Sequence, residues 1–247
     1  MDSYRLCKNF HNEVPLMPTI ALASPKGGAG KSTASALLGS NLAERGTTVT
    51  IIDADPNHPL VKWARRPGLP KGLHVVETNG EEQLVDAIEE ASTKTAFVIV
   101  DLEGTASSAV GIAMSRADLV LIPTKGSNLD AAEAVKAIKF IKFQEKIYRR
   151  EIPFAVLFTQ TRPAIRPRTQ VAIENELREQ GVPMLGTQLH ERDPYRAIFA
   201  FGGTLRGLDQ KEVRGIDAAM ADVHELVNEV IRHLDELITH SPQMSVA

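Results

Sequence analysis

The chain has 247 residues, a formal net charge of −3 and a hydrophobic fraction of 43%. This composition can form the core of one sizeable α/β domain and excludes an intrinsically disordered chain. Cys7 is the single cysteine, which excludes a disulfide framework and any zinc or iron–sulfur site that needs several cysteines from one chain.

Residues 1–17 are polar, aperiodic and interrupted by Pro15. They lack the apolar core of a signal peptide, and we expect a flexible N-terminal extension. No apolar run reaches the roughly 20 residues that a membrane-spanning helix needs, so we expect a soluble, cytoplasmic protein with no membrane partner. We predict a single domain over residues 18–240 and a tail over 241–247.

From residue 19 onward, short apolar runs alternate with amphipathic stretches. The apolar runs predict strands at 19–24, 48–53, 73–77, 96–101, 119–123 and 154–160. Most are too continuous for a sheet covered on one side, which indicates strands buried on both faces. The amphipathic stretches predict helices at 31–45, 81–93, 128–148, 168–180 and near 210–238. This alternation predicts an α/β fold with a mostly parallel, twisted sheet flanked by helices on both faces.

Glycines cluster directly after the first predicted strand, in the run SPKGGAGKST at 24–33. Glycine allows positive φ, so this loop can turn backbone N–H groups inward as a nest for anions, and the following helix adds the positive end of its dipole. Lys31 should reach the β- and γ-phosphates of a nucleotide, and the Ser32 hydroxyl should bind Mg²⁺. The alternative is a glycine-rich turn with a chance lysine.

The run therefore predicts a P-loop NTPase that binds ATP and Mg²⁺, with Lys31 as a catalytic residue. The residues expected to contact the nucleotide are Gly27, Gly28, Ala29, Gly30, Lys31, Ser32 and Thr33. Of these, we expect positive φ at Gly27, Gly28 and Gly30.

The loop departs from the general P-loop pattern, because Pro25 replaces its first glycine and Lys26 follows. This deviant Walker A form, KGGxGK[ST], resembles that of the ParA/MinD family of P-loop ATPases. The resemblance implies that Lys26 is a catalytic residue that reaches across a homodimer interface to the partner subunit's nucleotide, much as an arginine finger does. The alternative is a solvated loop lysine.

The run IIDADPN at 51–57 ends the second predicted strand, at the edge where ligands bind in parallel sheets. It resembles the DxDP motif of the same family. By this resemblance Asp53 helps to hold the Mg²⁺ shell, and Asp55 is the catalytic residue that orients or deprotonates the attacking water. The alternative is an Asx turn that closes the strand.

The run FVIVDLEG at 97–104 is an apolar strand that ends in Asp101, the arrangement of a Walker B motif. Asp101 is expected in the second shell of Mg²⁺, and Gly104 is expected to sense the γ-phosphate. The family often has proline where this chain has Glu103. A general-base role for Glu103 is a weaker alternative to Asp55.

The residues around the base are expected, by resemblance, to follow the sixth strand and the next one, at 159–162 and 189–193. We name Gln160 and Arg162 as base contacts, although loop residues at these places could equally be solvated.

Basic residues are concentrated between Lys125 and Arg168, where ten Lys and Arg stand against four acids, a net charge of +6 that leaves −9 for the rest. Lys136, Lys139, Lys142, Lys146 and Arg149 are spaced three and four apart and share one helical face. That face is either a solvated surface or a DNA contact.

In ParA relatives a basic residue precedes the last helix, which implies DNA binding by Arg214, with Lys211 and Arg196 as neighbours. Contacts of this kind reach phosphates and bind double-stranded DNA without sequence specificity. The equal alternative for Arg214 is a structural role.

The resemblance covers nearly all of residues 18–238, in the order KGGAGKS, DADPN and VDLEG. Nitrogenase-type reductases need cluster cysteines, and MinD-type proteins end in a basic amphipathic helix, whereas this last helix is acidic. The short ParA form fits best and implies ATP-dependent dimerisation, non-specific DNA binding on the nucleoid and reset by a ParB-like adaptor. The segment 186–199 resembles a VirC-type branch that positions conjugative relaxosomes, and a metabolic P-loop ligase is a third alternative.

Overall fold

The computed structural model describes residues 17–104, 107–163 and 166–240. The predicted N-terminal extension and tail lie almost entirely outside these residues and stay predictions. The strands are β1 Thr19–Leu22, β2 Val49–Ala54, β3 Leu73–Glu77, β4 Phe97–Leu102, β5 Leu119–Thr124, β6 Phe154–Thr161 and β7 Leu189–His190. They form one sheet in the order β3-β2-β4-β1-β5-β6-β7, and its strand pairs are parallel.

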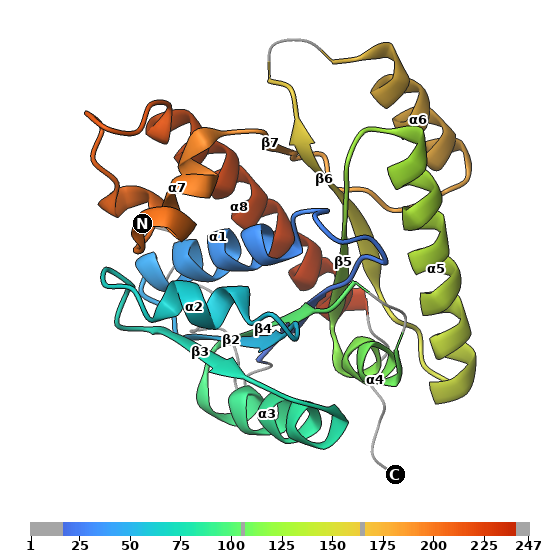
Figure 1. Cartoon of the computed structure of the whole chain (residues 1–247). Coiled ribbons are helices and arrows are strands. Elements are labelled where there is room, and N and C mark those ends of the chain that lie inside the picture. The colour runs from blue at the N-terminus through green and yellow to red at the C-terminus, as the bar shows by residue number, and fades with distance from the viewer. Residues whose placement is uncertain (1–16, 105–106, 164–165, 241–247) are drawn as a thin grey trace.

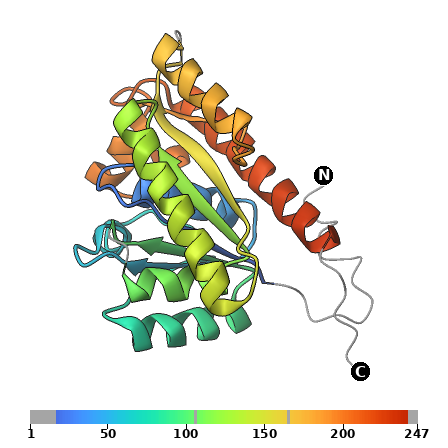
Figure 2. The same ribbon diagram turned by 90° about the vertical axis from the view of Figure 1, so that its right-hand side faces the viewer.

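The helices cover both faces of this sheet, as predicted (Figures 1 and 2). They are α1 Lys31–Glu44, α2 Pro59–Ala64, α3 Glu81–Lys94, α4 Ser108–Arg116, α5 Asn128–Tyr148, α6 Arg168–Glu179, α7 Asp193–Phe201 and α8 Ile216–His240, with a 3-10 turn at Leu205–Gly207. α1, α2, α7 and α8 share one hydrophobic core with the sheet, and α3, α4, α5 and α6 share the other.

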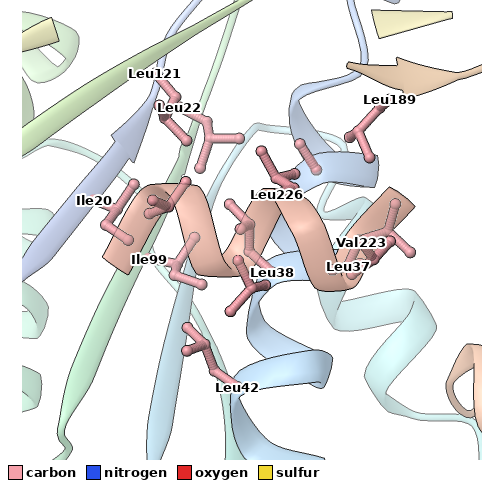
Figure 3. Close-up of a cluster of buried hydrophobic side chains, with 14 of the residues drawn as sticks. Ile20, Leu22, Leu37, Leu38, Leu42, Ile99, Leu121, Leu189, Val223 and Leu226 are labelled. Carbon is pink, nitrogen blue, oxygen red and sulfur yellow. The ribbon is translucent and has the colours of Figure 1, made fainter. Parts of the chain in front are cut away.

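The central strand shows why the apolar runs are continuous. In β1, Ile20 and Leu22 belong to the core beneath α1 and α8, while Ala21 belongs to the opposite core. Figure 3 shows the first of these cores, where side chains of β1, β4 and β5 meet leucines of α1 and α8. Alternate residues of one strand are thus buried on opposite faces, because helices cover both.

Some elements differ from the prediction. The last helix begins at Ile216 rather than near residue 210, because Gly215 has a φ of +78° that a continuing helix does not allow. The edge strand β3 is half exposed instead of buried on both faces. The helices α2, α4 and α7 were not predicted. The strand expected after the sixth one is β7, which has only two residues and begins at Leu189. Within the described residues no helix is both long enough and apolar enough to cross a membrane.

Candidate functional site

The loop between β1 and α1 lies at the carboxyl end of the sheet's central strand. Gly28 and Gly30 have φ angles of +74° and +95°, and Gly30 directly precedes α1 without a side-chain cap. The first N–H groups of α1 are therefore available to an anion, together with the positive end of the helix dipole. The predicted positive φ is wrong for Gly27.

Gly27 instead contributes to a close contact with the loop after β4. A Cβ on Gly104 would lie 3.3 Å from the Gly27 backbone nitrogen, so the lack of a side chain at Gly104 lets the two loops meet. This contact places the predicted γ-phosphate sensor directly against the P-loop.

Lys31 is buried, with 6% of its surface exposed. Its Nζ lies 3.5 Å from the Ser24 carbonyl oxygen. Burial lowers the pKa of Lys31, and the negative charges of Asp101, Asp55 and Glu103 oppose this effect. The lysine therefore lies where the predicted acidic residues converge, and a polyphosphate would supply the negative charge that a buried ammonium favours.

The predicted metal residues Ser32 and Asp101 are in direct contact. The Ser32 hydroxyl donates a 2.6 Å hydrogen bond to Asp101 Oδ2, and the Ser35 hydroxyl donates one of 3.3 Å to Oδ1. Asp101 is fully buried, and burial raises its pKa to about 7, with the neighbouring charge of Asp53 acting in the same direction. Asp53 lies beside it because these two residues pair in register across β2 and β4.

Asp53 has a structural function as well. Its Oδ2 accepts backbone hydrogen bonds from Leu60 at 2.8 Å and Val61 at 3.0 Å, which caps the start of α2. Burial raises the pKa of Asp53, while the backbone hydrogen bonds oppose the shift. One carboxylate oxygen is thus used by the fold, and Oδ1 accepts a 3.4 Å hydrogen bond from the Asp55 N–H.

Asp55 follows β2 and is half buried. Its Oδ1 accepts hydrogen bonds from the Asn57 backbone N–H at 2.8 Å and from the Asn57 Nδ2 at 3.0 Å. These bonds form an Asx turn, the alternative expected for this run. The turn and the catalytic prediction are compatible, because the turn orients a carboxylate whose charge acts on Lys31.

The Lys26 side chain is 41% exposed, but it is ion-paired rather than free in solvent. Its Nζ lies 2.6 Å from Asp130 Oδ1, in an ion pair between the P-loop and the first turn of α5. The Asp130 side chain is 7% exposed and also accepts a hydrogen bond from the Ser127 hydroxyl. Burial acts to raise the pKa of Asp130, but the hydrogen bonds from Lys26 and Ser127 outweigh it and lower the pKa.

Beside the P-loop is a hollow formed by the ends of β6 and β7 and the start of α7. It is lined by Gly30, Thr33, Thr159, Gln160, Leu189, His190, Glu191, Arg192, Tyr195 and Arg196. Both segments predicted to surround the base therefore contribute to it. Of the two named base contacts only Gln160 lines the hollow, because Arg162 lies beyond the end of β6 and is exposed.

The end of β6 also supports the P-loop. The Thr159 hydroxyl donates to the Ala29 carbonyl at 2.7 Å, and Gln160 Nε2 donates to the Gly28 carbonyl at 3.0 Å. Gln160 has a φ of +54°, an uncommon conformation for a residue with a side chain. A base in the hollow would thus lie against the same residues that fix the loop.

The far wall of the hollow includes Arg192, from the predicted segment 189–193, and Tyr195, which was not predicted. Arg192 makes two hydrogen bonds to Asp222 of α8, at 2.6 and 2.9 Å, and the Tyr195 hydroxyl donates to the same carboxylate at 3.3 Å. This network fixes α7 on α8. No local pattern could have indicated it, since Arg192 and Asp222 are 30 residues apart.

The three predicted DNA contacts lie in two different settings. Arg196 lines the hollow and pairs with Glu191. Lys211 and Arg214 are exposed in the loop before α8, with Arg214 next to Gly215. Of the three, only Lys211 and Arg214 therefore lie directly before the last helix, where the sequence predicts a DNA contact.

The described residues contain no group of three His, Cys, Asp or Glu side chains that could hold a metal by themselves. Mg²⁺ in nucleotide sites is bound by one or two protein groups together with phosphates and water. The Ser32 hydroxyl on the buried Asp101 carboxylate fits that mode.

Comparison with known proteins agrees with this geometry. The VirC1 protein family model matches residues 17–236. The chain is 38% identical to "Protein ParA" of Rhizobium radiobacter, over 90% of this chain and 100% of that protein. It is 30% identical to "Maintenance of carboxysome distribution protein A" of Halothiobacillus neapolitanus, over 86% of this chain and 96% of that protein.

Two solved structures are similar in fold. A complex of a Cyanothece McdA variant with ATP has a TM-score of 0.70 at 15% identity and covers 94% of this chain and 100% of its own. Cobyrinic acid a,c-diamide synthase from Mycobacterium smegmatis, with bound ADP and magnesium, has a TM-score of 0.65 at 17% identity and covers 89% and 96%.

Proposed function

The chain belongs to the VirC1 family within the ParA/MinD group of P-loop ATPases, and from this premise we propose that it is an ATP-switched partition ATPase. In this function the protein binds ATP, dimerises, binds double-stranded DNA without sequence specificity in the dimeric state, and is reset by hydrolysis. A ParB-like adaptor would stimulate the hydrolysis. The protein would act in the cytoplasm, on the nucleoid.

The observation that carries the proposal is the two-lysine loop. Lys31 is buried among acidic residues and has the environment of a lysine that binds the phosphates of its own subunit's nucleotide. Lys26 lies on the same loop but points to Asp130 instead. A second lysine on a P-loop has a use in hydrolysis if it serves the nucleotide of a facing subunit, as an arginine finger does.

The remaining residues divide the chemistry between them. The N–H groups of residues 27–33 would hold the phosphates, and Gln160 with the hollow would hold the base. Ser32, Asp53 and Asp101 would hold Mg²⁺, which when bound supplies positive charge that offsets repulsion between phosphates and carboxylates. Asp55 would orient or deprotonate the attacking water, because its turn fixes the carboxylate beside the site.

DNA binding is assigned to the loop before α8. Arg214 and Lys211 are exposed there, as phosphate contacts must be. Arg196 is the least favoured of the three, since it lines the hollow beside the P-loop.

A VirC-like ATPase that positions a conjugation complex or another cargo is the second candidate, and the match to the VirC1 family model favours it. This candidate shares the ATP site and the dimer and differs in what the dimer carries. A metabolic ligase is less favoured, because in a ligase Lys26 would serve only in the ion pair with Asp130 and not in hydrolysis.

The proposed function is tested by binding to random duplex DNA with ATP and Mg²⁺, with ADP, and without nucleotide, each at two salt concentrations. We expect retention with ATP alone and a steep loss of affinity at the higher salt. Arg214→Glu should weaken binding equally for all sequences, while Lys71→Glu, an exposed charge reversal elsewhere, should not. Equal binding in the three nucleotide states would reject the partition function.

A further inference from the structure

The outer surface of α5 combines cations with exposed apolar side chains. Within the described residues, three of the seven exposed large hydrophobic side chains lie in its last six residues: Phe143 is 57% exposed, Ile147 53% and Tyr148 42%. Figure 2 shows α5 at the front of the molecule, with no other element drawn over it.

The charged residues alternate with the apolar ones on one face. Lys139 precedes Phe143 by four residues and Lys146 follows it by three, so the three side chains are neighbours on the helix surface. Ile147 lies one turn after Phe143, and Arg149 ends the helix. We call Lys139, Phe143, Lys146, Ile147 and Arg149 the α5 ridge.

The cations of the ridge are uncompensated. Elsewhere on the helix Lys136 pairs with Glu133, and Lys142 pairs with Glu145 and lies 5.5 Å from the centre of the Phe154 ring. Lys139, Lys146 and Arg149 form no ion pair or side-chain hydrogen bond with any other residue that the structure describes. The ridge therefore has three free positive charges around an apolar centre.

We propose that the α5 ridge is a docking site for an acidic amphipathic helix of a partner protein. Protein interfaces typically have apolar side chains at the centre and charged side chains at the rim, and the α5 ridge has this arrangement. The free charges select a partner with carboxylates on both sides of its own apolar stripe. From Lys139 to Arg149 the ridge is about 15 Å long, which about three turns of a partner helix would cover.

Other occupants fit less well. DNA phosphates would use the cations but leave Phe143 and Ile147 without apolar contacts. A membrane surface requires an apolar face along the helix, and the apolar face of α5 is already buried through Ala134, Ala137 and Ile141. A second α5 would bring like charges together. The terminal segments outside the described residues offer no excess of acid, since 1–16 has two acids and two bases and 241–247 has no charge.

A hollow beside the α5 ridge could bind a carboxylate of the docked helix. Lys142, Lys146, Arg149 and Arg150 line a hollow at the end of α5, together with Glu145 and Glu151. A carboxylate of the docked helix can enter this hollow while its apolar stripe covers Phe143.

The probe for the test is a fluorescein-labelled 18-residue peptide with leucines on one helical face and glutamates on both sides of it. A peptide of the same composition with permuted order, and therefore no apolar face, is the control. Fluorescence anisotropy on the full chain should show at least about tenfold tighter binding of the amphipathic peptide.

Two pairs of substitutions separate the apolar centre from the rim. Phe143→Ser with Ile147→Ser should weaken peptide binding about tenfold or more, and Lys139→Glu with Lys146→Glu should do the same and remove its salt dependence. Phe201→Ser, another exposed apolar side chain at 61%, and Lys71→Glu are the matched controls and should bind like the wild type. Circular dichroism verifies that each variant is folded.

Equal binding of the two peptides, or unchanged binding by both ridge variants, would overturn the proposal. The proposal would also be overturned if the wild type binds no peptide and the ridge substitutions abolish its binding to another surface. The surfaces to measure are random duplex DNA and vesicles of phosphatidylcholine and phosphatidylglycerol. The proposed ATPase and its DNA binding are measured separately, so failure of the ridge proposal leaves them intact, and the reverse is also true.

Discussion

At the scale of single residues, Asp101 is in an environment that opposes its charge. It is fully buried beside Asp53, and its pKa is raised to about 7 from an ordinary value of 3.8. The folded chain therefore binds this proton more tightly than the unfolded chain between pH 4 and 7. Stability contributed by this residue falls as pH rises through that window.

Asp101→Asn removes this cost. Without nucleotide or Mg²⁺, the free energy of unfolding of the variant relative to the wild type should increase with pH from 4 to 8, by up to about 4 kcal/mol, because each pKa unit corresponds to about 1.4 kcal/mol. Urea denaturation at several pH values measures this. A difference that is constant with pH would mean that the carboxyl ionises normally.

The ion pair of Lys26 gives a second prediction. In the proposed dimer Lys26 would have to leave Asp130 to reach the facing nucleotide, so the ion pair would oppose dimerisation. Asp130→Asn should therefore lower the protein concentration at which ATP produces dimers, by several-fold. Sedimentation velocity over a concentration series tests this, and weaker or unchanged dimerisation would contradict it.

Lys26→Ala should keep ATP binding but lose dimer-dependent hydrolysis.

The residues of the site were largely predictable, and their contacts were not. The P-loop, Asp53, Asp55 and Asp101 are each placed by a motif next to a strand end, so local sequence was sufficient. Asp130 is 104 residues from Lys26, and Ser32 is 69 residues from Asp101. Only the fold brings these pairs together, and none of the predicted motifs contains Asp130.

At the scale of elements, the link between Asp53 and α2 shows how the site depends on a short helix. α2 has six residues and follows His58, whose φ is +45°. Its first N–H groups are capped by a carboxylate seven residues earlier in the chain. The sequence did not predict this helix, because its stability comes from that cap and from the burial of Leu60 and Trp63.

Asp53→Ala removes the carboxylate that accepts hydrogen bonds from the Leu60 and Val61 backbone N–H groups. We expect a loss of about 2 kcal/mol in the free energy of unfolding, measured without nucleotide or Mg²⁺. The matched variant is Asp55→Ala, whose carboxylate is half exposed and should affect stability less. If the two variants are equally stable in that condition, Asp53 has no capping function of consequence.

The other elements followed the sequence to within a few residues where their pattern was long. α3 and α6 have a clear hydrophobic periodicity, α1 is buried on most of its surface, and α4 contains Gly111 in its centre. A Cβ at Gly111 would lie 2.9 Å from the end of the Gln144 side chain of α5, so this glycine leaves room for Gln144 in its present position between the two helices. The sequence shows a poor helix former there, and only the tertiary contact explains it.

At the scale of the whole molecule, the charge separation found in the sequence has a place in the fold. The window 125–168, with net charge +6, covers α5, β6 and the start of α6, while the remaining −9 is spread over the rest of the chain. The nucleotide site lies at the carboxyl ends of the strands, and the α5 ridge lies on the outer helix layer. The sites proposed for ATP, for DNA and for a protein partner thus lie on different elements.

The proposed conversion of the chain into a dimer by ATP can be measured as the mass of the Asp55→Ala variant in solution. This substitution should block hydrolysis and keep ATP bound. Size-exclusion chromatography with light scattering should give twice the 26.9 kDa of one chain with ATP and Mg²⁺, and 26.9 kDa with ADP. A mass of one chain in both nucleotides would show that ATP does not dimerise the protein.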